Sequence, residues 1–416
     1  MKIVHVMPHM GGGVGKALST LVEVFEVNNY SHSFIVLENL EKKQFFNKIK
    51  KSGCEVYIKP NKKTINKLIK SADIIQLEWW NHPAIFQFLC THNFPKIRLL
   101  VWCHVSGLYT PIIPIKLISS SSRFLFTSAC SYKSDDIISL NETDKLKLGV
   151  VSSGTGFTPE KPKVFKSKVQ LNYGYMGSLN TSKLHPRFID YLSGVSISNF
   201  KVGIWGDDFY KDDMVFQCEE VGNPNLIKFN GYTTSPASTL LSLDIFIYLL
   251  NPNHYGTAEN VLLEAMSLGV IPIVLNNPAE IEIVKNRETG LIVSSKNEFV
   301  EAINWLENNP DERKRISINA SKIVAEKYTL ETMFQSMKSF YDQNMSLPKS
   351  TVNFNNVLGS EPYEWYMACQ KYIDIELDNS NKNAKNSENE ETKGSLRHYL
   401  DYFPYDSRLN RLLSDL

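Results

Sequence analysis

The sequence predicts an α/β protein with two Rossmann-like, doubly wound domains that face a cleft. Two observations lead to this prediction. Short apolar stretches alternate with segments of helical length, and the alternation stops near residue 153 and starts again at 169. Strands separated by helix-length segments favour βαβ units and parallel sheets. The 416 residues are also enough for about two to three domains. A ligand site is therefore expected between the domains, at the carboxyl ends of the strands.

The first domain is expected over residues 1–153. A glycine-rich loop follows its first strand, and a helix is predicted from about Val14 to Val27. The predicted strands are 2–8, 33–38, 54–59, 73–79, 98–107 and 123–129. Residues 154–168 are rich in Gly, Pro, Ser and Lys, which is typical of a linker.

The second domain is expected over residues 169–343. The predicted strands are 169–177, 200–206, 226–232, 244–250, 270–275 and 290–293. Helices lie between these strands, and three further helical stretches at 297–307, 311–327 and 330–343 are predicted to close the domain.

Residues 344–416 are expected to form an extension of different character. Its segment 378–394 is polar and of low complexity, which is typical of disorder. The residues after it carry aromatics and leucines. Two interpretations stay open for them: a docked helical element, or a tail that binds a partner.

The charge distribution argues against nucleic acid, because the whole chain carries a net charge of only +1. The first 70 residues nevertheless hold twelve lysines, no arginine and five glutamates. Four of these lysines flank apolar residues at helical spacing: Lys62, Lys63, Lys67 and Lys70. This basic helix is either a solvated face or a contact with an anionic bilayer or lipid-phosphate acceptor.

The six cysteines show no C-x-x-C spacing and no regular framework, so zinc and disulfides are not expected. The sequence begins without an apolar stretch of the signal-peptide type, and about 18 consecutive apolar residues occur nowhere in it. The protein is therefore predicted to be cytoplasmic, either soluble or peripheral on the inner face of the membrane.

The glycine loop over residues 11–13 follows the first strand and opens a helix. Glycines let the backbone approach a ligand closely, and a helix N-terminus favours an anion. The loop is not a P-loop, because Met10 stands where a glycine is needed and Ala17 where Ser or Thr is needed. A tight turn and a phosphate-binding loop both stay open as interpretations.

The segment 244–275 is predicted to be one βαβ unit, with a helix from about Thr257 to Leu268. Thr257 can cap this helix. A polar stripe runs along the helix in an otherwise apolar pattern and contains Thr257, Asn260, Glu264 and Ser267. An ionised Glu264 in the middle of a covered helix needs a partner, such as the diol of a sugar or ribose. The alternative is that the stripe faces water.

The stretch "ENVLLEAMSLGVIPIV", followed by "ETGLIV", resembles the donor-binding signature of retaining glycosyltransferases of the GT-B fold, in the large family 4. The glycine loop and the stretches "GYMGSLNTSK", "FKVGIWGDD" and "FNGY" are similar too. The likeness covers about residues 1–343 and is strongest over 174–293.

The resemblance implies roles for several residues. Glu264 is the last glutamate of an E-x7-E pattern and would bind the nucleotide ribose. Lys183 lies six residues after Gly177, a strand-end glycine, and would bind the diphosphate. His104, at the end of a strand in the first domain, would lie beside the reacting sugar and orient it or stabilise its cationic transition state. A core histidine is the alternative there.

The resemblance also implies that the backbone amides of Gly12 and Gly13 approach the phosphates. Two positions depart from the family pattern. Gly256 stands where the first glutamate of E-x7-E is expected, and Ser178 stands where an arginine is usual. Glu259 is a candidate replacement for the missing glutamate.

The candidate site residues fall into three groups. The catalytic residues are His104, Lys183 and Glu264. The donor-binding residues are Gly12, Gly13, Gly177, Ser178, Tyr232, Gly256, Thr257, Glu259, Asn260 and Val261. Trp79 and Trp80 are candidates for stacking on the acceptor sugar, with core packing as the alternative.

The activity that the resemblance implies is transfer from a nucleoside-diphosphate sugar to a glycan or lipid-linked glycan, with retention, in the synthesis of a surface polysaccharide or lipopolysaccharide. Lys183, the glycine-loop amides and a helix N-terminus would stabilise the leaving diphosphate. The sequence has no D-x-D pattern in a plausible loop, so no metal and no other cofactor is expected. Two alternatives stay open: a sugar-nucleotide epimerase of the same fold, and a non-catalytic binder of sugar nucleotides or glycans.

Overall fold

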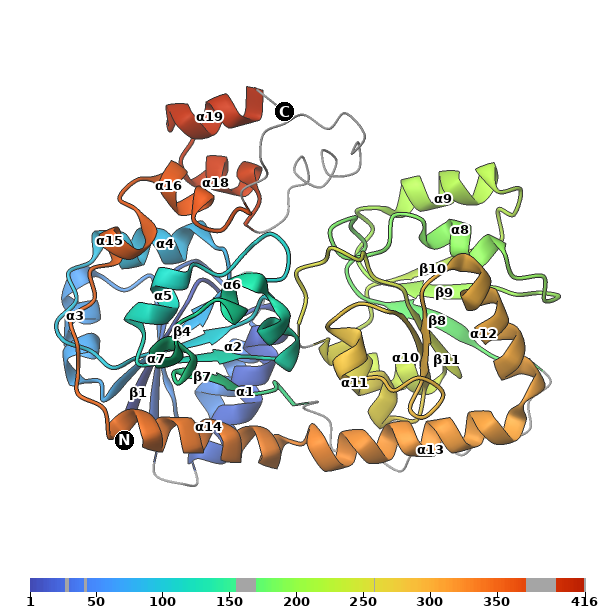
Figure 1. Ribbon diagram of the computed structural model, residues 1–416, viewed down its shortest axis with the longest axis horizontal. Helices are drawn as coiled ribbons and strands as arrows, with labels where there is room; N and C mark the ends of the chain where they lie inside the picture. Colours follow the sequence, from blue (N-terminus) through green and yellow to red (C-terminus); the bar gives the residue numbers. More distant parts are fainter. Residues whose placement is uncertain (27–29, 41–42, 155–169, 258, 372–393, 415–416) are drawn as a thin grey trace. The chain divides into compact units, whose positions relative to one another are not determined.

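The structure is a computed structural model that describes residues 1–26, 30–40, 43–154, 170–257, 259–371 and 394–414. It contains two compact units (Figure 1). The first unit comprises Met1–Ser153 together with Leu330–Leu416, and the second comprises Gly154–Thr329. The predicted linker 154–168 and the low-complexity segment 378–394 lie outside the described residues, apart from Gly154 and Gly394.

The first unit is built on a parallel sheet of seven strands in the order β3-β2-β1-β4-β5-β6-β7. The strands are β1 (Lys2–Met7), β2 (Ser31–Val36), β3 (Glu55–Ile58), β4 (Ile74–Trp79), β5 (Leu99–Cys103), β6 (Arg123–Phe126) and β7 (Leu148–Val150). The order reverses between β1 and β4. This switch point is where doubly wound sheets bind ligands, outside the carboxyl ends of the strands.

Helices cover both faces of this sheet, because consecutive strand residues point to opposite faces and almost all of them are apolar. In β1, Ile3 and Met7 join one core, whereas Val4 and Val6 join the other. Helices α1 (Gly12–Glu26), α2 (Gln44–Lys51) and α14 (Leu330–Met345) cover the first core. Helices α3 (Lys62–Ser71), α4 (Pro83–Thr91) and α5 (Ile115–Ser120) cover the second.

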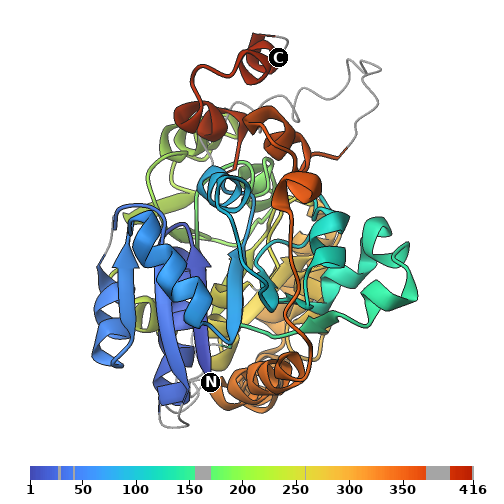
Figure 2. The same ribbon diagram turned by 90° about the vertical axis from the view of Figure 1, so that its left-hand side faces the viewer.

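Between β6 and β7 the chain forms the short helices η1 (Ala129–Lys133), α6 (Asp135–Ile138) and α7 (Glu142–Lys145). Beyond α14, four helices among the described residues pack on the first unit. They are α15 (Phe354–Leu358), α16 (Pro362–Met367), α18 (Leu396–Tyr402) and α19 (Ser407–Ser414). Helices α15, α16 and α18 contact α4. Figures 1 and 2 show these orange and red helices gathered beside α4. Of the two interpretations for the residues after the low-complexity segment, docking holds for α18 and α19.

The predicted domain boundary at residue 343 differs from the structure, because α14 belongs to the first unit. Met333, Phe334, Met337 and Tyr341 insert into the core under α1. A Cβ atom on Gly149 in β7 would lie 2.2 Å from Cζ of Phe340, so the helix rests directly on this strand. The apolar face of α14 therefore needs the first sheet, and helical periodicity alone cannot tell which sheet a terminal helix covers.

The second unit has a parallel sheet of six strands in the order β10-β9-β8-β11-β12-β13. The strands are β8 (Tyr173–Met176), β9 (Val202–Trp205), β10 (Ile227–Gly231), β11 (Ile245–Tyr248), β12 (Ile271–Leu275) and β13 (Leu291–Val293). The helices are α8 (Phe188–Ser193), α9 (Lys211–Glu220), α10 (Pro236–Leu241), α11 (Asn260–Ser267), η2 (Glu280–Glu282), α12 (Lys296–Asn308) and α13 (Pro310–Lys327). Here the order reverses between β8 and β11.

Helix α11 begins at Asn260, three residues later than predicted, and Thr257 does not cap it. The residue in the N-cap position is Glu259, whose backbone is left-handed (φ 34°, ψ 54°). A left-handed residue cannot continue a right-handed helix towards the N-terminus, so the backbone of Glu259 sets the helix boundary.

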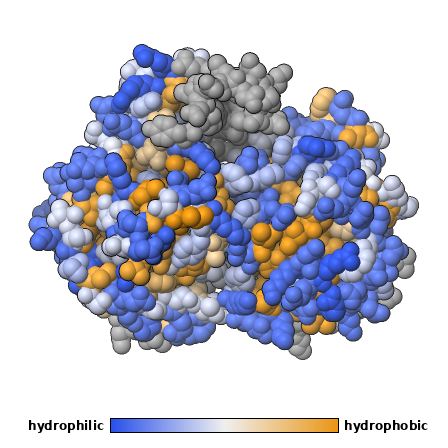
Figure 3. Space-filling model, viewed as in Figure 1, coloured by the Kyte–Doolittle hydropathy of each residue, from blue (hydrophilic) through white to orange (hydrophobic). Residues whose placement is uncertain are grey.

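No helix among the described residues is both long and apolar enough to cross a bilayer. The face of the molecule in Figure 3 carries hydrophilic residues interspersed with separate hydrophobic patches. The basic helix α3 has the predicted polarity: Leu68 and Ile69 are buried, and its four lysines are exposed.

The placement of α14 predicts a local effect of Met337→Ala. Met337 is fully buried in the core of the first unit. Truncating a buried methionine lowers the free energy of unfolding by about 2–5 kcal/mol. Hydrogen exchange should then become faster in β1 and β4 and stay unchanged in β8 and β11. The control is Gln335→Ala at an exposed position of the same helix, which should alter stability by less than about 0.5 kcal/mol. Faster exchange confined to β8 and β11 would contradict this placement.

Candidate functional site

Buried charged side chains meet in the second unit near its switch point. Lys183 follows β8, Glu259 follows β11, and Glu280 follows β12. Because the carboxyl ends of parallel strands share one edge, the loops after these strands bring residues distant in sequence together.

Glu259 is the centre of this group. Its side chain is only 2% exposed, and Lys183 Nζ lies 3.2 Å from its Oε2. The hydroxyl of Tyr248, at the end of β11, donates a hydrogen bond to the same oxygen. A buried carboxylate requires such partners, because an unpaired charge in the interior is strongly destabilising.

The pKa values agree with a charged pair. Although burial alone raises the pKa of Glu259, the Lys183 ammonium and the other donors hold that pKa below its usual range. Burial alone likewise lowers the pKa of Lys183, but the Glu259 carboxylate holds it above its ordinary value. Lys183 is still 25% exposed, so its ammonium is both paired and accessible to an anionic ligand.

His254 links Glu259 to Glu280. Its Nδ1 lies 3.9 Å from Glu259 Oε1, and its Nε2 lies 3.0 Å from Glu280 Oε1. The backbone N–H of Gly256 donates to Nδ1 at 3.0 Å, so the proton of the neutral ring lies on Nε2, facing Glu280. Burial lowers the pKa of His254, but the Glu280 carboxylate outweighs burial and raises it overall. Burial raises the pKa of Glu280.

Gly256 and Glu259 depend on each other sterically. A Cβ atom on Gly256 would lie 2.1 Å from Glu259 Oε1 and 2.7 Å from His254 Nδ1. Thus the carboxylate of Glu259 occupies the space that a side chain at position 256 would take. The absence of a side chain at 256 allows Glu259 to pair with Lys183.

This arrangement requires a strained backbone. Glu259 has a positive φ of 34°, which few residues other than glycine adopt. Such strain costs on the order of 1–3 kcal/mol and persists where the surroundings fix the residue. Here the contacts of the carboxylate with Lys183 and Tyr248 fix it.

The other predicted residues of this segment are largely covered. Glu264 lies in the middle of α11 and is 5% exposed, so the polar stripe does not face water there. Thr257 is buried, Asn260 is half-buried in the first turn, and Val261 packs partly against the core. The contacts described above centre on Glu259, and Glu264 lies five residues further along the same helix.

The remaining donor candidates of this unit lie at strand ends. The N–H of Gly177, just after β8, donates to the carbonyl of Trp205 at 3.0 Å. Ser178 is exposed, and its carbonyl accepts a hydrogen bond from the Tyr175 hydroxyl at 2.9 Å. Tyr232 follows β10 and is 69% exposed.

In the first unit, the glycine loop opens α1 as predicted. Gly12 has a positive φ of 64° and no heavy atom within 4 Å of where a Cβ would stand. Gly12 and Gly13 are both exposed. The loop thus leaves open space at a helix N-terminus, which suits an anion.

His104 follows β5 and is held by a carboxylate that the sequence did not suggest. Its Nε2 lies 2.9 Å from Oε2 of Glu78, a fully buried residue of β4. Because an ionised carboxylate only accepts hydrogen bonds, the proton of His104 lies on Nε2. Nδ1 makes no hydrogen bond with any described residue, and its lone pair remains available for a ligand.

Glu78 accepts two further hydrogen bonds. His5 Nδ1 lies 3.0 Å from its Oε1, and Gln76 donates to the same oxygen at 2.8 Å. His5 Nε2 in turn lies 2.8 Å from Nδ1 of the buried His32. Burial alone raises the pKa of Glu78, but the hydrogen bonds from His104 and His5 hold it below its ordinary value.

Trp79 is not available to an acceptor. It is fully buried and packs on Phe86, with ring centroids 5.1 Å apart, so of the two interpretations core packing holds for it. It lies within β4, where inward-facing positions belong to the core. Trp80, the next residue, is half-buried, and its ring lies edge-on to His104 at 6.1 Å.

Within the part of the chain that the structure describes, two groups of side chains have the residue types of a metal site: His254, Glu259 and Glu280, and His9, Glu38 and His82. In the first group, Lys183 and Tyr248 already engage Glu259, and both nitrogens of His254 have partners. A cation there would have to displace these contacts, so the first group fits an ion poorly.

The comparison with protein families finds a match within the second unit. Residues 157–323 are similar to the family described as Glycosyl transferases group 1. The capsular polysaccharide biosynthesis glycosyltransferase CapM of Staphylococcus aureus is 27% identical over 228 residues, which are 50% of this chain and 58% of CapM. The chain thus aligns with little more than half of this relative, and both similarities support a glycosyltransferase.

Solved structures share the fold of the chain. A glycosyltransferase from Rickettsia africae ESF-5 matches with a TM-score of 0.64 at 15% identity, covering 83% of this chain and 98% of that one. HepE of Anabaena, in complex with UDP and glucose, matches with a TM-score of 0.63 at 15% identity, covering 82% and 100%. The predicted GT-B fold is confirmed.

The steric dependence of positions 256 and 259 predicts a rescue. Gly256→Glu should lower the free energy of unfolding by about 1–3 kcal/mol, because the new side chain displaces the Glu259 carboxylate. Glu259→Gly should also be destabilising, because it leaves Lys183 without its buried partner. Measured by urea unfolding, the loss of stability in the double variant should be about 1–3 kcal/mol smaller than the sum of the losses in the two single variants. Purely additive losses would argue against a shared space.

Glu78→Gln should change how stability depends on pH. A lowered pKa in the folded state stabilises the protein above the ordinary glutamate value of about 4.5, and this contribution is lost as the pH falls through the folded value. The variant should therefore be less stable than wild type at pH 7, and the difference should shrink below about pH 4.5. Urea unfolding from pH 7 to 3.5 measures it. The exposed Glu326→Gln is the control; a constant difference for Glu78→Gln would contradict the prediction.

Proposed function

We propose that the protein is a glycosyltransferase that moves a sugar from a nucleoside-diphosphate sugar to a glycan or lipid-linked glycan during the synthesis of a surface polysaccharide or lipopolysaccharide. The observation that carries the proposal is the buried pair of Lys183 and Glu259 beside the switch point of the unit that is similar to Glycosyl transferases group 1. CapM acts in capsular polysaccharide biosynthesis, which supports a surface glycan as product.

The donor is held by the second unit in this proposal. Lys183 is the accessible cation, and a diphosphate is the ligand that matches it. Glu259 keeps the ammonium charged and in place. Since HepE binds UDP and glucose, uridine diphosphate sugars are the first donors to test. Glu264 binds the ribose, a role that rests on the resemblance.

The proposed reaction requires the protein to stabilise the negative charge that develops on the leaving diphosphate. As the bond to the anomeric carbon breaks, the diphosphate gains charge, which Lys183 neutralises. Retention, the stereochemistry that the resemblance implies, has the acceptor hydroxyl attack on the leaving-group side and lose its proton to the diphosphate. His104, oriented by Glu78, offers the lone pair of Nδ1 to the reacting sugar. We propose that no metal takes part, because Lys183 supplies the positive charge.

The cytoplasmic location and the membrane contact are also proposals. The four exposed lysines of α3 form a basic face on the first unit. A lipid-linked acceptor would bring such a face to an anionic bilayer, where each lysine near the surface contributes about 1 kcal/mol.

Lys183→Ala should lower transfer from the best donor by about 10²–10³-fold, the usual cost of removing one charge-stabilising donor. The measurement is transfer and release of free nucleotide with a panel of UDP, GDP, ADP, CMP and dTDP sugars. Lys285→Ala is the matched control, because Lys285 is 58% exposed and pairs only at the surface with Glu288.

Full transfer by Lys183→Ala would refute the assigned site. Binding of a donor, seen as a thermal shift, without turnover by the wild-type protein would favour the non-catalytic binder instead. Conversion of the donor sugar without an acceptor would favour the epimerase.

A further inference from the structure

The first unit contains an open cavity of about 570 Å³ at the carboxyl ends of β2 and β3. Glu38 and Lys59 line it from the loops after these strands, Gln87 and Phe88 from α4, and Tyr402 from α18. Its volume lies within the range of about 300–1,000 Å³ that small-molecule sites occupy. The functional residues named so far do not line it.

Tyr402, in the C-terminal segment 394–402, lines this cavity, and specific contacts fix the segment. The Tyr402 hydroxyl donates a hydrogen bond to Glu38. One turn earlier in α18, the Tyr399 hydroxyl donates to Asn81 Oδ1 at 2.7 Å, and Asn81 Nδ2 donates to the carbonyl of Gly394 at 3.0 Å. Asn81 lies in the loop after β4, so α18 is attached to the ligand-binding edge of the sheet.

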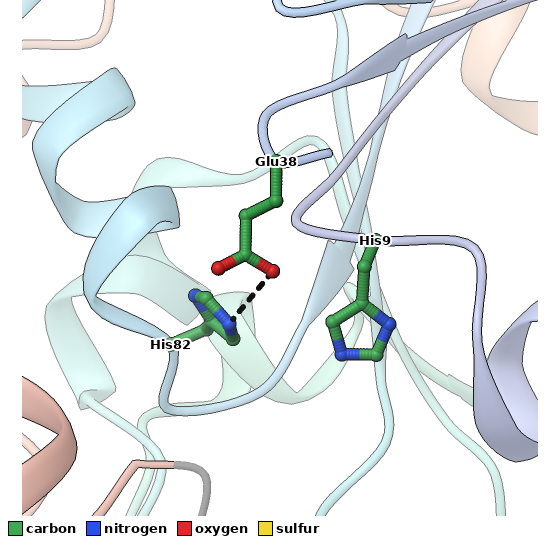
Figure 4. A group of neighbouring side chains, drawn as sticks. All are labelled: His9, Glu38 and His82. Atoms are coloured by element: carbon green, nitrogen blue, oxygen red, sulfur yellow. Dashed lines mark ion pairs between the residues drawn. The ribbon is translucent and has the colours of Figure 1, made fainter. Parts of the chain in front are cut away.

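Three side chains at this edge point toward one another in Figure 4. His9 follows β1, Glu38 follows β2, and His82 precedes α4. His82 Nε2 lies 3.5 Å from Glu38 Oε2. The Glu38 carboxylate thus faces His82 and accepts a hydrogen bond from Tyr402 of α18.

The two histidines of this group suit hydrogen bonding better than metal binding. The Gly11 N–H donates to His9 Nδ1 at 3.1 Å, and the Ala84 N–H donates to His82 Nδ1 at 3.2 Å. The proton of each neutral ring is therefore on Nε2, the nitrogen that a metal would need unprotonated. The group is therefore better described as a hydrogen-bonding cluster that positions the Glu38 carboxylate at the edge of the cavity than as a metal site.

A row of rings connects this group with His104. Ring centroids are 6.1 Å apart between His104 and Trp80, 5.4 Å between Trp80 and His9, and 5.9 Å between His9 and His82. Tyr402 continues the row, 5.9 Å from His82. Aromatic faces and edges with polar tips are suited to holding sugar rings.

We propose that the cavity binds a sugar residue of the acceptor glycan, next to the residue that receives the transferred sugar, and that segment 394–402 completes this subsite. The proposal rests on the proposed function, since it places the receiving sugar at His104. It assigns the specificity for acceptor length to the C-terminal extension. Glu38 and Gln87 supply acceptors and donors for hydroxyls, and Tyr402 supplies the ring.

Saturation-transfer NMR titrations with the full-length protein test the subsite without requiring transfer. The probes are glucose, maltose and maltotriose, and N-acetylglucosamine, chitobiose and chitotriose. Gln87→Trp fills the cavity from an exposed position of α4, so it leaves the core intact. Its control is Gln335→Trp, on the exposed face of α14 in the same unit. Tyr402→Phe removes one hydroxyl, and the 96% exposed Tyr405→Phe is its control.

We expect a trisaccharide of one series to bind the wild type more tightly than its monosaccharide. Gln87→Trp should weaken that trisaccharide by about tenfold or more, and Tyr402→Phe by less, whereas both controls should bind as the wild type does. Equal binding by wild type and Gln87→Trp, or no binding of any of these saccharides, would overturn the proposal.

The outcome separates the two proposals. If no sugar nucleotide shifts the melting temperature or is turned over, but Gln87→Trp abolishes trisaccharide binding, the subsite stands and the proposed transferase activity fails. If transfer occurs with the same KM for short and long acceptors in wild type and Gln87→Trp, the activity stands and the subsite fails.

Discussion

The cost of burying a carboxylate shapes the candidate site of each unit. Glu259 and Glu78 are both removed from water, and an ionised carboxylate in the interior is tolerated only when donors surround it. Glu259 is stabilised by Lys183 and Tyr248, and Glu78 by two histidines and Gln76. Lys183 follows β8, His5 lies in β1 and His104 follows β5, so each buried charge links the end of its own strand to a neighbouring strand.

This constraint also explains the local geometry. The left-handed backbone of Glu259, the late start of α11 and the bare position 256 follow from directing one carboxylate towards Lys183. In the first unit, the same requirement leaves one nitrogen of His104 unused, because Glu78 engages the other. Each buried acid therefore fixes the cation or imidazole that faces the ligand.

Much of the fold follows from the sequence, and less of the site does. Alternating apolar and helical stretches predict every strand except β7, which has three residues and lies beside lysines. The resemblance implies the role of Lys183 and leaves Glu259 as a candidate for the glutamate missing at position 256, but the contact between the two is evident only in the structure. The role of Glu78 does not follow from the sequence. A carboxylate in an apolar strand can be recognised as part of a site only when its donors from β1 and from the end of β5 are known. The only local signal for a polar role of Glu78 is that Gln76, two residues earlier, lies on the same face of β4. His254, Tyr248 and Glu280 likewise depend on tertiary contacts.

The return of the chain to the first sheet makes the second unit an insertion into the first. Residues 154–329 are contiguous, whereas the first unit needs both Met1–Ser153 and Leu330–Leu416. Met337 and Tyr341 complete its core, and Tyr399 closes its edge, yet these residues are synthesised after the second unit. Domains usually fold as units in the order of their synthesis. Here the inserted unit is complete before the first sheet receives the C-terminal helices that cover it.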